Sequence, residues 1–259
     1  KHLLLISSFF RMMTMMAFAM VLQYRLRDLG ASLLLISMLA AVTGGMQSIT
    51  SPLWGKIADA SGLRGRLLLI IGVLAVFLYP LYGFLSLPYM FLFIAGAVAF
   101  FEAGFNPIAM SLMSESSGTD IELRSRNLAL FNAASAAGIL AGRLSLSAAL
   151  SFLPVATTVL VLSIGTLGAA IPTLFLPARS ADSAGAHPNP DPTGYRHRRL
   201  RLSPRKEDLA ICGMWAVYLG TFIRNIGVAG FISISALYMK EGIGLSESHS
   251  MLVAGIDPL

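Results

Sequence analysis

The key to the fold is the stretch Gly55–Leu67. It reads Gly-Lys-Ile-Ala-Asp-Ala-Ser-Gly-Leu-Arg-Gly-Arg-Leu. It is short, charged and glycine-bearing, and it separates two apolar runs, Ala31–Leu53 and Leu67–Leu85. A membrane-spanning helix needs about 20 mostly apolar residues, so each run is long enough to cross a bilayer. The stretch is therefore predicted to be a tight turn between two membrane helices.

The composition of the whole chain supports a membrane protein. Hydrophobic residues make up 56% of the 259 residues, charged residues make up 12%, and the mean hydropathy is +0.73. A soluble domain is typically about 25% charged, so a soluble protein is excluded. The first apolar run, Leu3–Tyr24, is too long for the apolar core of a signal peptide. A single cysteine, Cys212, excludes an internal disulfide framework.

The remaining chain divides into further apolar runs and one polar segment. The predicted spanning runs are Leu3–Tyr24, Ala31–Leu53, Leu67–Leu85, Tyr89–Met113, Asn127–Leu150, Phe152–Leu176 and Leu209–Met239, with an eighth beginning near Ser248. Residues 177–206 are polar and rich in proline, which is typical of a flexible linker. The predicted fold is all-α and polytopic: a six-helix bundle over residues 1–176, a linker over 177–206, and the start of a second, truncated bundle over 207–259.

The positions of the basic residues predict the orientation. Loops on the side of the amino terminus, counting the linker, hold twelve Lys and Arg residues, and loops on the other side hold three. Because basic residues accumulate in cytoplasmic loops, the amino terminus, the Gly55–Leu67 turn and the linker should be cytoplasmic. The basic excess, with a pI near 9.8, is thus a topology signal first, and nucleic-acid binding is not expected. The run Arg196–Lys206 could contact anionic lipid of the bilayer; an ordinary solvated linker is the alternative.

An internal repeat links the first run to the seventh. A pattern that includes an intramembrane arginine, a tyrosine, an acid, a glycine and a serine recurs 213 or 214 residues later. Its members are Arg11, Tyr24, Asp28, Gly30 and Ser32, followed by Arg224, Tyr238, Glu241, Gly244 and Ser246. Two bundles related by a parallel repeat are a known transporter arrangement. The period implies a longer protein, so the chain is expected to be a fragment that lacks the remaining helices of its second half.

The Gly55–Leu67 stretch, hereafter the signature loop, resembles the motif G-x-L-A-D-R-x-G-R-K/R of the major facilitator superfamily. The matching residues are Gly55, Ile57, Ala58, Asp59, Gly62 and Arg64. Ala60 and Leu63 depart from it, because each stands where the family usually has a basic residue. The resemblance implies a secondary transporter, with a solute site near the bilayer midplane between helices one, four and seven.

Charged residues inside the predicted spans are the candidates for that site, because each costs about 2.5–3.5 kcal/mol at a helix centre. Arg11 lies about 12 Å from the cytoplasmic edge and Glu102 lies about 10 Å from it, counting 1.5 Å per residue. We therefore predict that they form a pair or share a cavity. The other candidates for the cavity are Thr14 and Asn106, which share helix faces with them, and Arg224 and Asn225, which the repeat supplies. A pair that only fixes helix packing is the alternative.

The signature loop is expected to act as a gate. Gly62 can adopt a positive φ, and Gly55 can let its helix approach a neighbour closely. Asp59 can accept hydrogen bonds from Arg64, Arg66 or Arg126. The resemblance implies that this loop latches the cytoplasmic side as the two halves move. An ordinary charged turn is the alternative.

Other residues are given simpler roles. The small residues Gly138 and Gly142 should allow close helix contact. Arg143, near the outer end of its helix, should extend to the interface, and Trp54 should anchor the chain there. The four histidines lie in loops or at the ends of the chain, so no metal site, cofactor or catalytic constellation is predicted.

The predicted function is secondary active transport of a small solute by alternating access, in the plasma membrane and without enzymatic activity. Two arginines in the cavity hint at an anionic solute; a drug-like efflux substrate and coupling to protons stay open. A receptor or sensor without flux is one alternative, and a membrane enzyme is another, although the clustered catalytic groups it needs are not visible. A third is a fragment that is inactive by itself.

Overall fold

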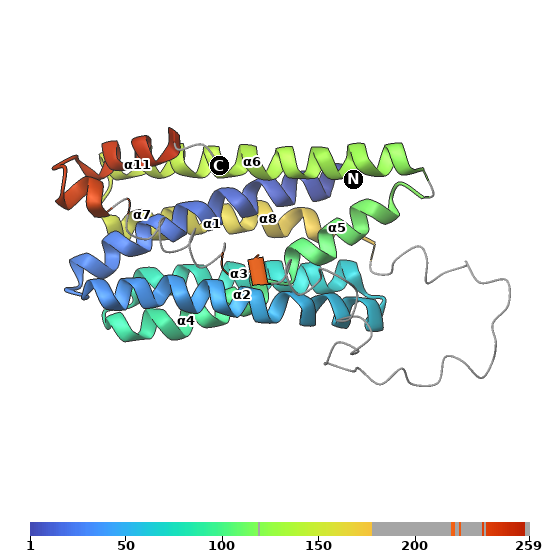
Figure 1. The fold of residues 1–259 in the computed structure, drawn as a ribbon, viewed down its shortest axis with the longest axis horizontal. Helices are drawn as coiled ribbons and strands as arrows, with labels where there is room; N and C mark the ends of the chain where they lie inside the picture. The colour runs from blue at the N-terminus through green and yellow to red at the C-terminus, as the bar shows by residue number, and fades with distance from the viewer. Residues whose placement is uncertain (119, 178–218, 221–222, 224–234, 236, 257–259) are drawn as a thin grey trace, which may run out of the picture.

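The structure, a computed structural model, describes residues 1–118, 120–177, 219–220, 223, 235 and 237–256. Within them the fold is all-α, as predicted (Figure 1). The helices are α1 His2–Asp28, α2 Leu33–Ser61, α3 Arg64–Phe84, α4 Pro88–Glu102, α5 Phe105–Glu115, α6 Ile121–Phe152, α7 Val155–Ser163, α8 Gly165–Leu174 and α11 Glu247–Ile256. The predicted linker and most of the predicted seventh span lie outside the described residues.

Six segments of the described chain are long and apolar enough to cross a membrane. They correspond to the six predicted spans, but two of them are broken. The fourth changes from α4 to α5 at Ala103 and Gly104. Pro107, four residues after Ala103, has no N–H to donate to the Ala103 carbonyl, and this opens the helix. The sixth changes from α7 to α8 at Ile164, where the Thr166 hydroxyl donates to the Ser163 carbonyl at 2.6 Å and competes with the helical backbone.

Local signals set the helix ends. The Ser32 side chain accepts from the Leu35 N–H at the start of α2, and the Asp120 side chain accepts from the Leu123 N–H at the start of α6. Both are N-caps, which satisfy a backbone donor that the first turn leaves unpaired. Gly62 ends α2 with φ of 64°, so the predicted positive φ is confirmed. The turn to α3 is therefore as tight as the sequence indicated.

The helices pack around α1. It contacts α6, α7 and α8, while α2 packs against α4, and α3 packs against α4, α7 and α8 (Figure 1). One apolar cluster lies toward the α1–α2 turn, which we call the far end, and contains Tyr24, Tyr82 and Phe91. The other lies toward the signature-loop end and contains Trp54 and Leu68. Along α1, Arg11 falls between the residues of these two clusters.

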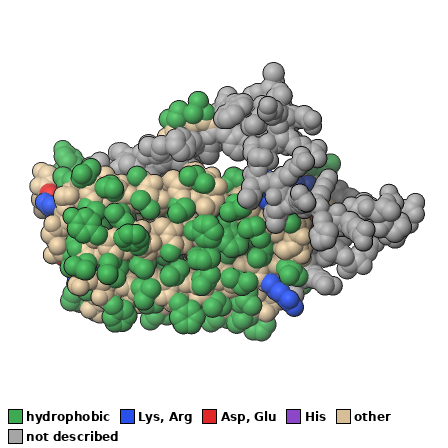
Figure 2. All heavy atoms as spheres, turned by 90° about the horizontal axis from the view of Figure 1, so that it is seen from below, with side chains coloured by type: hydrophobic (Ala, Val, Ile, Leu, Met, Phe, Trp, Pro, Cys, Tyr) green, Lys and Arg blue, Asp and Glu red, His purple; other side chains and the backbone are tan. Residues whose placement is uncertain are grey.

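The outer surface of the bundle is apolar. Large side chains such as Phe77, Phe84, Phe93 and Phe152 are mostly exposed, and hydrophobic groups cover the face seen in Figure 2, with charged side chains at its two ends. A soluble protein rarely exposes an apolar area of this extent. With six apolar helices, this surface is that of an integral, multi-pass membrane protein.

Candidate functional site: a buried ion pair beside a cavity

Arg11 on α1 and Glu102 at the end of α4 form a buried ion pair. Their side chains are 6% and 5% exposed, and Arg11 Nε donates to Glu102 Oε2. Arg11 Nη2 donates to the Glu102 carbonyl oxygen at 2.6 Å, and Nη1 donates to Asn106 Oδ1 at 3.2 Å. The guanidinium also lies over the Phe105 ring, 4.3 Å from its centroid. The predicted pairing is confirmed, and every Arg11 nitrogen has an acceptor.

The helix break between α4 and α5 makes this arrangement possible. The Glu102 carbonyl lies at the break, where Arg11 can reach it, and α5 starts at Phe105, which places the ring and the Asn106 amide beside the guanidinium. A charge in an apolar interior is tolerated when its hydrogen bonds are satisfied. The break and the pair therefore depend on each other.

A small cavity of about 20 Å³ adjoins the pair on the side of α3 and α8. Its polar lining consists of Arg11, Glu102, Thr14, Tyr79, Thr166 and Thr173. The volume is enough for one water molecule. Thr14 lines this cavity, but its hydroxyl donates to the Phe10 carbonyl of its own helix at 2.9 Å. Of the predicted cavity residues, Arg224 and Asn225 lie outside the described residues.

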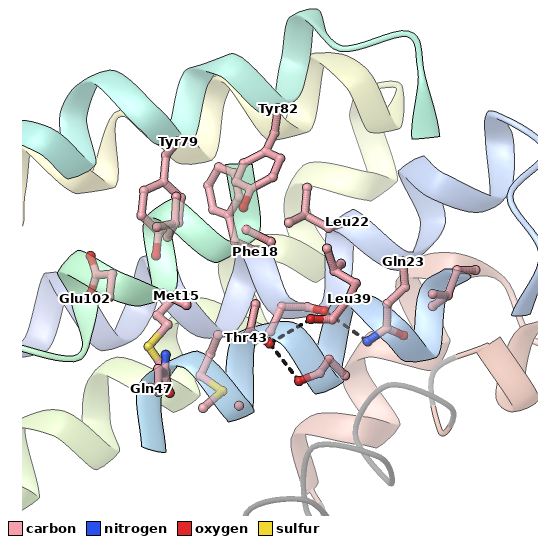
Figure 3. Close-up of a pocket in the computed structure, with 18 residues that line it drawn as sticks. Met15, Phe18, Leu22, Gln23, Leu39, Thr43, Gln47, Tyr79, Tyr82 and Glu102 are labelled. Atoms are coloured by element: carbon pink, nitrogen blue, oxygen red, sulfur yellow. Dashed lines mark hydrogen bonds between the residues drawn. The ribbon is translucent and has the colours of Figure 1, made fainter. Parts of the chain in front are cut away.

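A larger cavity of about 340 Å³ lies on the other side of Glu102, between α1, α2, α3 and α4. Figure 3 shows Tyr79 and Tyr82 pointing into it from α3, with Glu102 toward one end and Gln23 toward the other. Its polar lining residues are Gln23, Thr43, Gln47, Tyr79, Tyr82 and Glu102. Of these residues, Glu102 alone was predicted from the sequence. The others could have been identified from amide and hydroxyl side chains that stand inside apolar runs.

The signature loop carries a second charged cluster. Arg64, at the start of α3, donates to Asp59 Oδ1 at 2.8 Å and also pairs with Glu115 at the end of α5. Arg64 is thus the partner of Asp59, out of the three that the sequence left open; Arg66 and Arg126 are exposed. The predicted close approach of a neighbouring helix at Gly55 is wrong, because a Cβ there would meet nothing within 4 Å in the described residues. Glu115 was missed, since it is distant in sequence from the loop.

The profile of the Major Facilitator Superfamily matches residues 4–256, which is nearly the whole chain. The chain belongs to this superfamily. It is therefore a membrane transporter of the general kind that the superfamily comprises, and the resemblance drawn from the signature loop is confirmed. A comparison with curated proteins finds no match.

The far end of the transporter carries a third set of ion pairs. Arg27, at the end of α1, donates to both carboxylate oxygens of Glu241, at 2.6 and 3.1 Å. Lys240 pairs with Glu247 and lies over the Tyr24 ring, 5.1 Å from its centroid. The internal repeat matches Asp28 to Glu241. The Arg27–Glu241 pair therefore joins the end of the first span to the residue that corresponds, in the repeat, to Asp28, the neighbour of Arg27.

Three predictions about packing have mixed outcomes. A Cβ at Gly138 or Gly142 would lie 2.2 Å from the carbonyl oxygen of Phe9 or Met13 on α1, so the predicted close contact is confirmed. Arg143 is 5% exposed, and its predicted extension to the interface is wrong. The predicted interfacial role of Trp54 is also wrong, because this side chain is buried and its Nε1 donates to the Phe100 carbonyl at 2.6 Å.

The described residues contain no group of three or more His, Cys, Asp or Glu side chains that could hold a metal ion. The chemistry of the site is therefore built from one carboxylate, one guanidinium, amides, hydroxyls and aromatic rings. Such a set can bind an organic solute.

Proposed function

We propose that the protein moves a small organic solute across the membrane by alternating access, with the large cavity as part of the solute site. The observation that carries this proposal is the position of Glu102, which lines both the large cavity and the small one while it pairs with Arg11. An ion pair that served helix packing alone would have no reason to border an open cavity. Ionisable groups inside membranes mark solute or ion pathways by default.

Glu102 is also the proposed coupling group, with a proton as the coupling ion. Among the described residues, it is the one charged group that lines the large cavity. Protonation would remove its charge and weaken its bond to Arg11, so binding of a solute and of a proton would be linked there. The signature loop, through Arg64, Asp59 and Glu115, is the proposed gate.

The proposed location is the plasma membrane, with the amino terminus, the signature loop and the linker over residues 177–206 in the cytoplasm. The support is the distribution of Lys and Arg, which concentrates on one side of the predicted spans. The solute and the helices of a second half are the proposed partners.

Flux in reconstituted vesicles tests this function. A panel of labelled organic cations, anions and neutral compounds is offered under an imposed pH gradient, and uptake is measured. Glu102→Gln should lower the uptake of any transported compound at least about tenfold, which corresponds to a loss of about 1.4 kcal/mol. Glu122→Gln is the matched control, because Glu122 is exposed at the start of α6, and it should transport normally.

Two outcomes would contradict the proposal. If compounds bind but none crosses the membrane, the proposed transport by this chain is contradicted. If Glu102→Gln transports as well as the unmodified protein, the carboxylate has no part in the solute site or in proton coupling.

A further inference from the structure

The charge and shape of the large cavity indicate what kind of solute it accepts. Most of its wall is apolar, and it includes the thioethers of Met15 and Met16 and the rings of Phe18, Tyr79 and Tyr82. No Lys, Arg or His belongs to the lining among the residues that the structure describes. Its volume of about 340 Å³ lies at the lower end of the range for pockets that enclose a drug-sized molecule.

Glu102 is the one charged group of the wall among the residues that the structure describes. Glu102 Oε2 and the Glu102 carbonyl are taken by Arg11, whereas Oε1 makes no hydrogen bond within the described chain. Arg11 itself does not line this cavity. Its nitrogens are directed to Glu102 and Asn106, and its face lies on Phe105. The cavity therefore meets the negative member of the pair, and the positive member is turned away from it.

The other lining groups suit a positive charge as well. Aromatic faces attract cations, and the effect grows when water is excluded. The Thr43 hydroxyl donates to carbonyls of its own helix, at 3.0 Å to Leu39 and 3.0 Å to Ala40, so its remaining capacity toward the cavity is as an acceptor. Figure 3 shows Gln47 and Met15 side by side between Tyr79 and the α2 ribbon, on the same side of the cavity as Glu102. From this cavity an anion would meet the Glu102 carboxylate first, because its partner Arg11 does not line the wall.

We propose that this cavity binds a lipophilic organic monocation, with its charged end toward Glu102 Oε1 and its apolar body between Phe18, Tyr79 and Tyr82. The proposal rests on the proposed function in that it takes this cavity as the solute site. It differs from the anionic solute that Arg11 and Arg224 suggested in the sequence, because the hydrogen bonds of Arg11 commit it to the far side of Glu102.

Binding to the purified protein in lipid nanodiscs tests this proposal without any flux. The probes are three compounds of similar shape: methylphenylpyridinium as the cation, phenylpyridine at a pH where it is neutral, and biphenylcarboxylate as the anion. The cation should bind at least about tenfold more tightly than either of the others. Ala40→Phe, which fills the cavity from α2 without touching the ion pair, should abolish binding of the cation.

A charge change at Gln47 gives the sharper readout. Gln47→Glu should raise the affinity for the cation, and Gln47→Lys should lower it and let the anion bind. These variants keep Glu102 and Arg11 intact, so they are informative even if Glu102→Gln folds poorly. Equal binding of the three probes, tighter binding of the anion or of the neutral compound, or cation binding that Ala40→Phe leaves unchanged would each overturn the proposal.

The outcomes separate this inference from the proposed transport. Cation binding without flux would leave the cavity assignment standing and remove the transport function. Flux of anions or neutral compounds, with no binding of the cation, would leave the transport function standing and remove the assignment of the cavity to a cation.

Discussion

Two arginines of α1 each pair with a glutamate elsewhere in the chain. The pairs Arg11–Glu102 and Arg27–Glu241 have the same chemistry but differ in burial and in the groups that surround them. The first is 6% and 5% exposed, and the second is 40% and 38% exposed. The first is supported by further acceptors and an aromatic ring. The second stands at the far end with two hydrogen bonds between its own members. α1 thus carries one pair that is enclosed by the bundle and one that solvent can reach.

The two pairs suit different tasks. Removing one member of a buried pair leaves an uncompensated charge in an apolar interior, which is strongly destabilising. An exposed pair contributes little, because water and salt already solvate both members. The buried pair is therefore a fixed part of the interior, while the far-end pair can open and close at small cost. The following changes test that contrast, in order of decreasing effect.

The largest effect is expected for Arg11→Met. It leaves the Glu102 carboxylate buried without its partner, so the free energy of unfolding in mixed micelles should fall by about 3–5 kcal/mol. Replacing both members, as in Arg11→Met with Glu102→Met, should recover much of this loss, since no buried charge remains. A single variant as stable as the unmodified protein would show that the pair is open to water.

The next effect is expected for Gly142→Ala. The added Cβ would lie 2.2 Å from the Met13 carbonyl oxygen, so α1 must move away from α6, at a cost of about 1–3 kcal/mol. Gly45→Ala is the matched control, because a Cβ at Gly45 would meet nothing within 4 Å.

The Gly142→Ala variant also sharpens the contrast between the two pairs. Because it displaces α1 next to Arg11, its cost in unfolding free energy should be smaller in an Arg11→Met background. In an Arg27→Gln background its cost should be unchanged, since distant sites contribute additively. Additivity with both variants would show that the position of α1 does not affect the buried pair.

A smaller effect is expected at the far end. In a double-mutant cycle of Arg27→Gln and Glu241→Gln, the coupling between the two side chains should be about 0.2–1 kcal/mol. It should decline when the salt concentration is raised, because the screening length falls from about 10 Å at 0.1 M to about 3 Å at 1 M. A coupling above that range, insensitive to salt, would mean that this pair is enclosed as well.

The smallest effect on stability is expected for Asp59→Asn. Asp59 is 70% exposed, and Arg64 keeps its second partner, Glu115, so the unfolding free energy should change by less than about 0.5 kcal/mol. Uptake should nevertheless slow, because the proposed gate loses one of its ion pairs. Normal uptake with lowered expression would remove the signature loop from the gating role.

Position along a helix could be predicted from the sequence, because each residue advances by a fixed rise. That rule placed Arg11 and Glu102 at one depth, and the structure pairs them. The lengths of the apolar runs located the six spans, and the glycine in the charged stretch between two of them located the tight turn at Gly62. The helix opening near Glu102 was not predicted, although Pro107, which lacks a donor, was its signal in the sequence.

Rotation about the helix axis could not be predicted. Helices that are apolar on all sides carry almost no amphipathic signal to show which face is buried. For that reason the inward positions of Tyr79 and Tyr82 were missed, and the burial of Trp54 and Arg143 was mistaken for interfacial placement. The direction in which these side chains point is set by the helices that pack against them, and the local sequence does not identify those helices.

The break at Ala103 and Gly104 has a mechanical consequence. It separates α5 as a rod of 11 residues, about 16 Å long at the usual rise per residue. One end of the rod carries Phe105 and Asn106, which hold Arg11, and the other end carries Glu115, which holds Arg64. A displacement of α5 along its own axis would therefore change both contacts together, which couples the membrane interior mechanically to the signature loop.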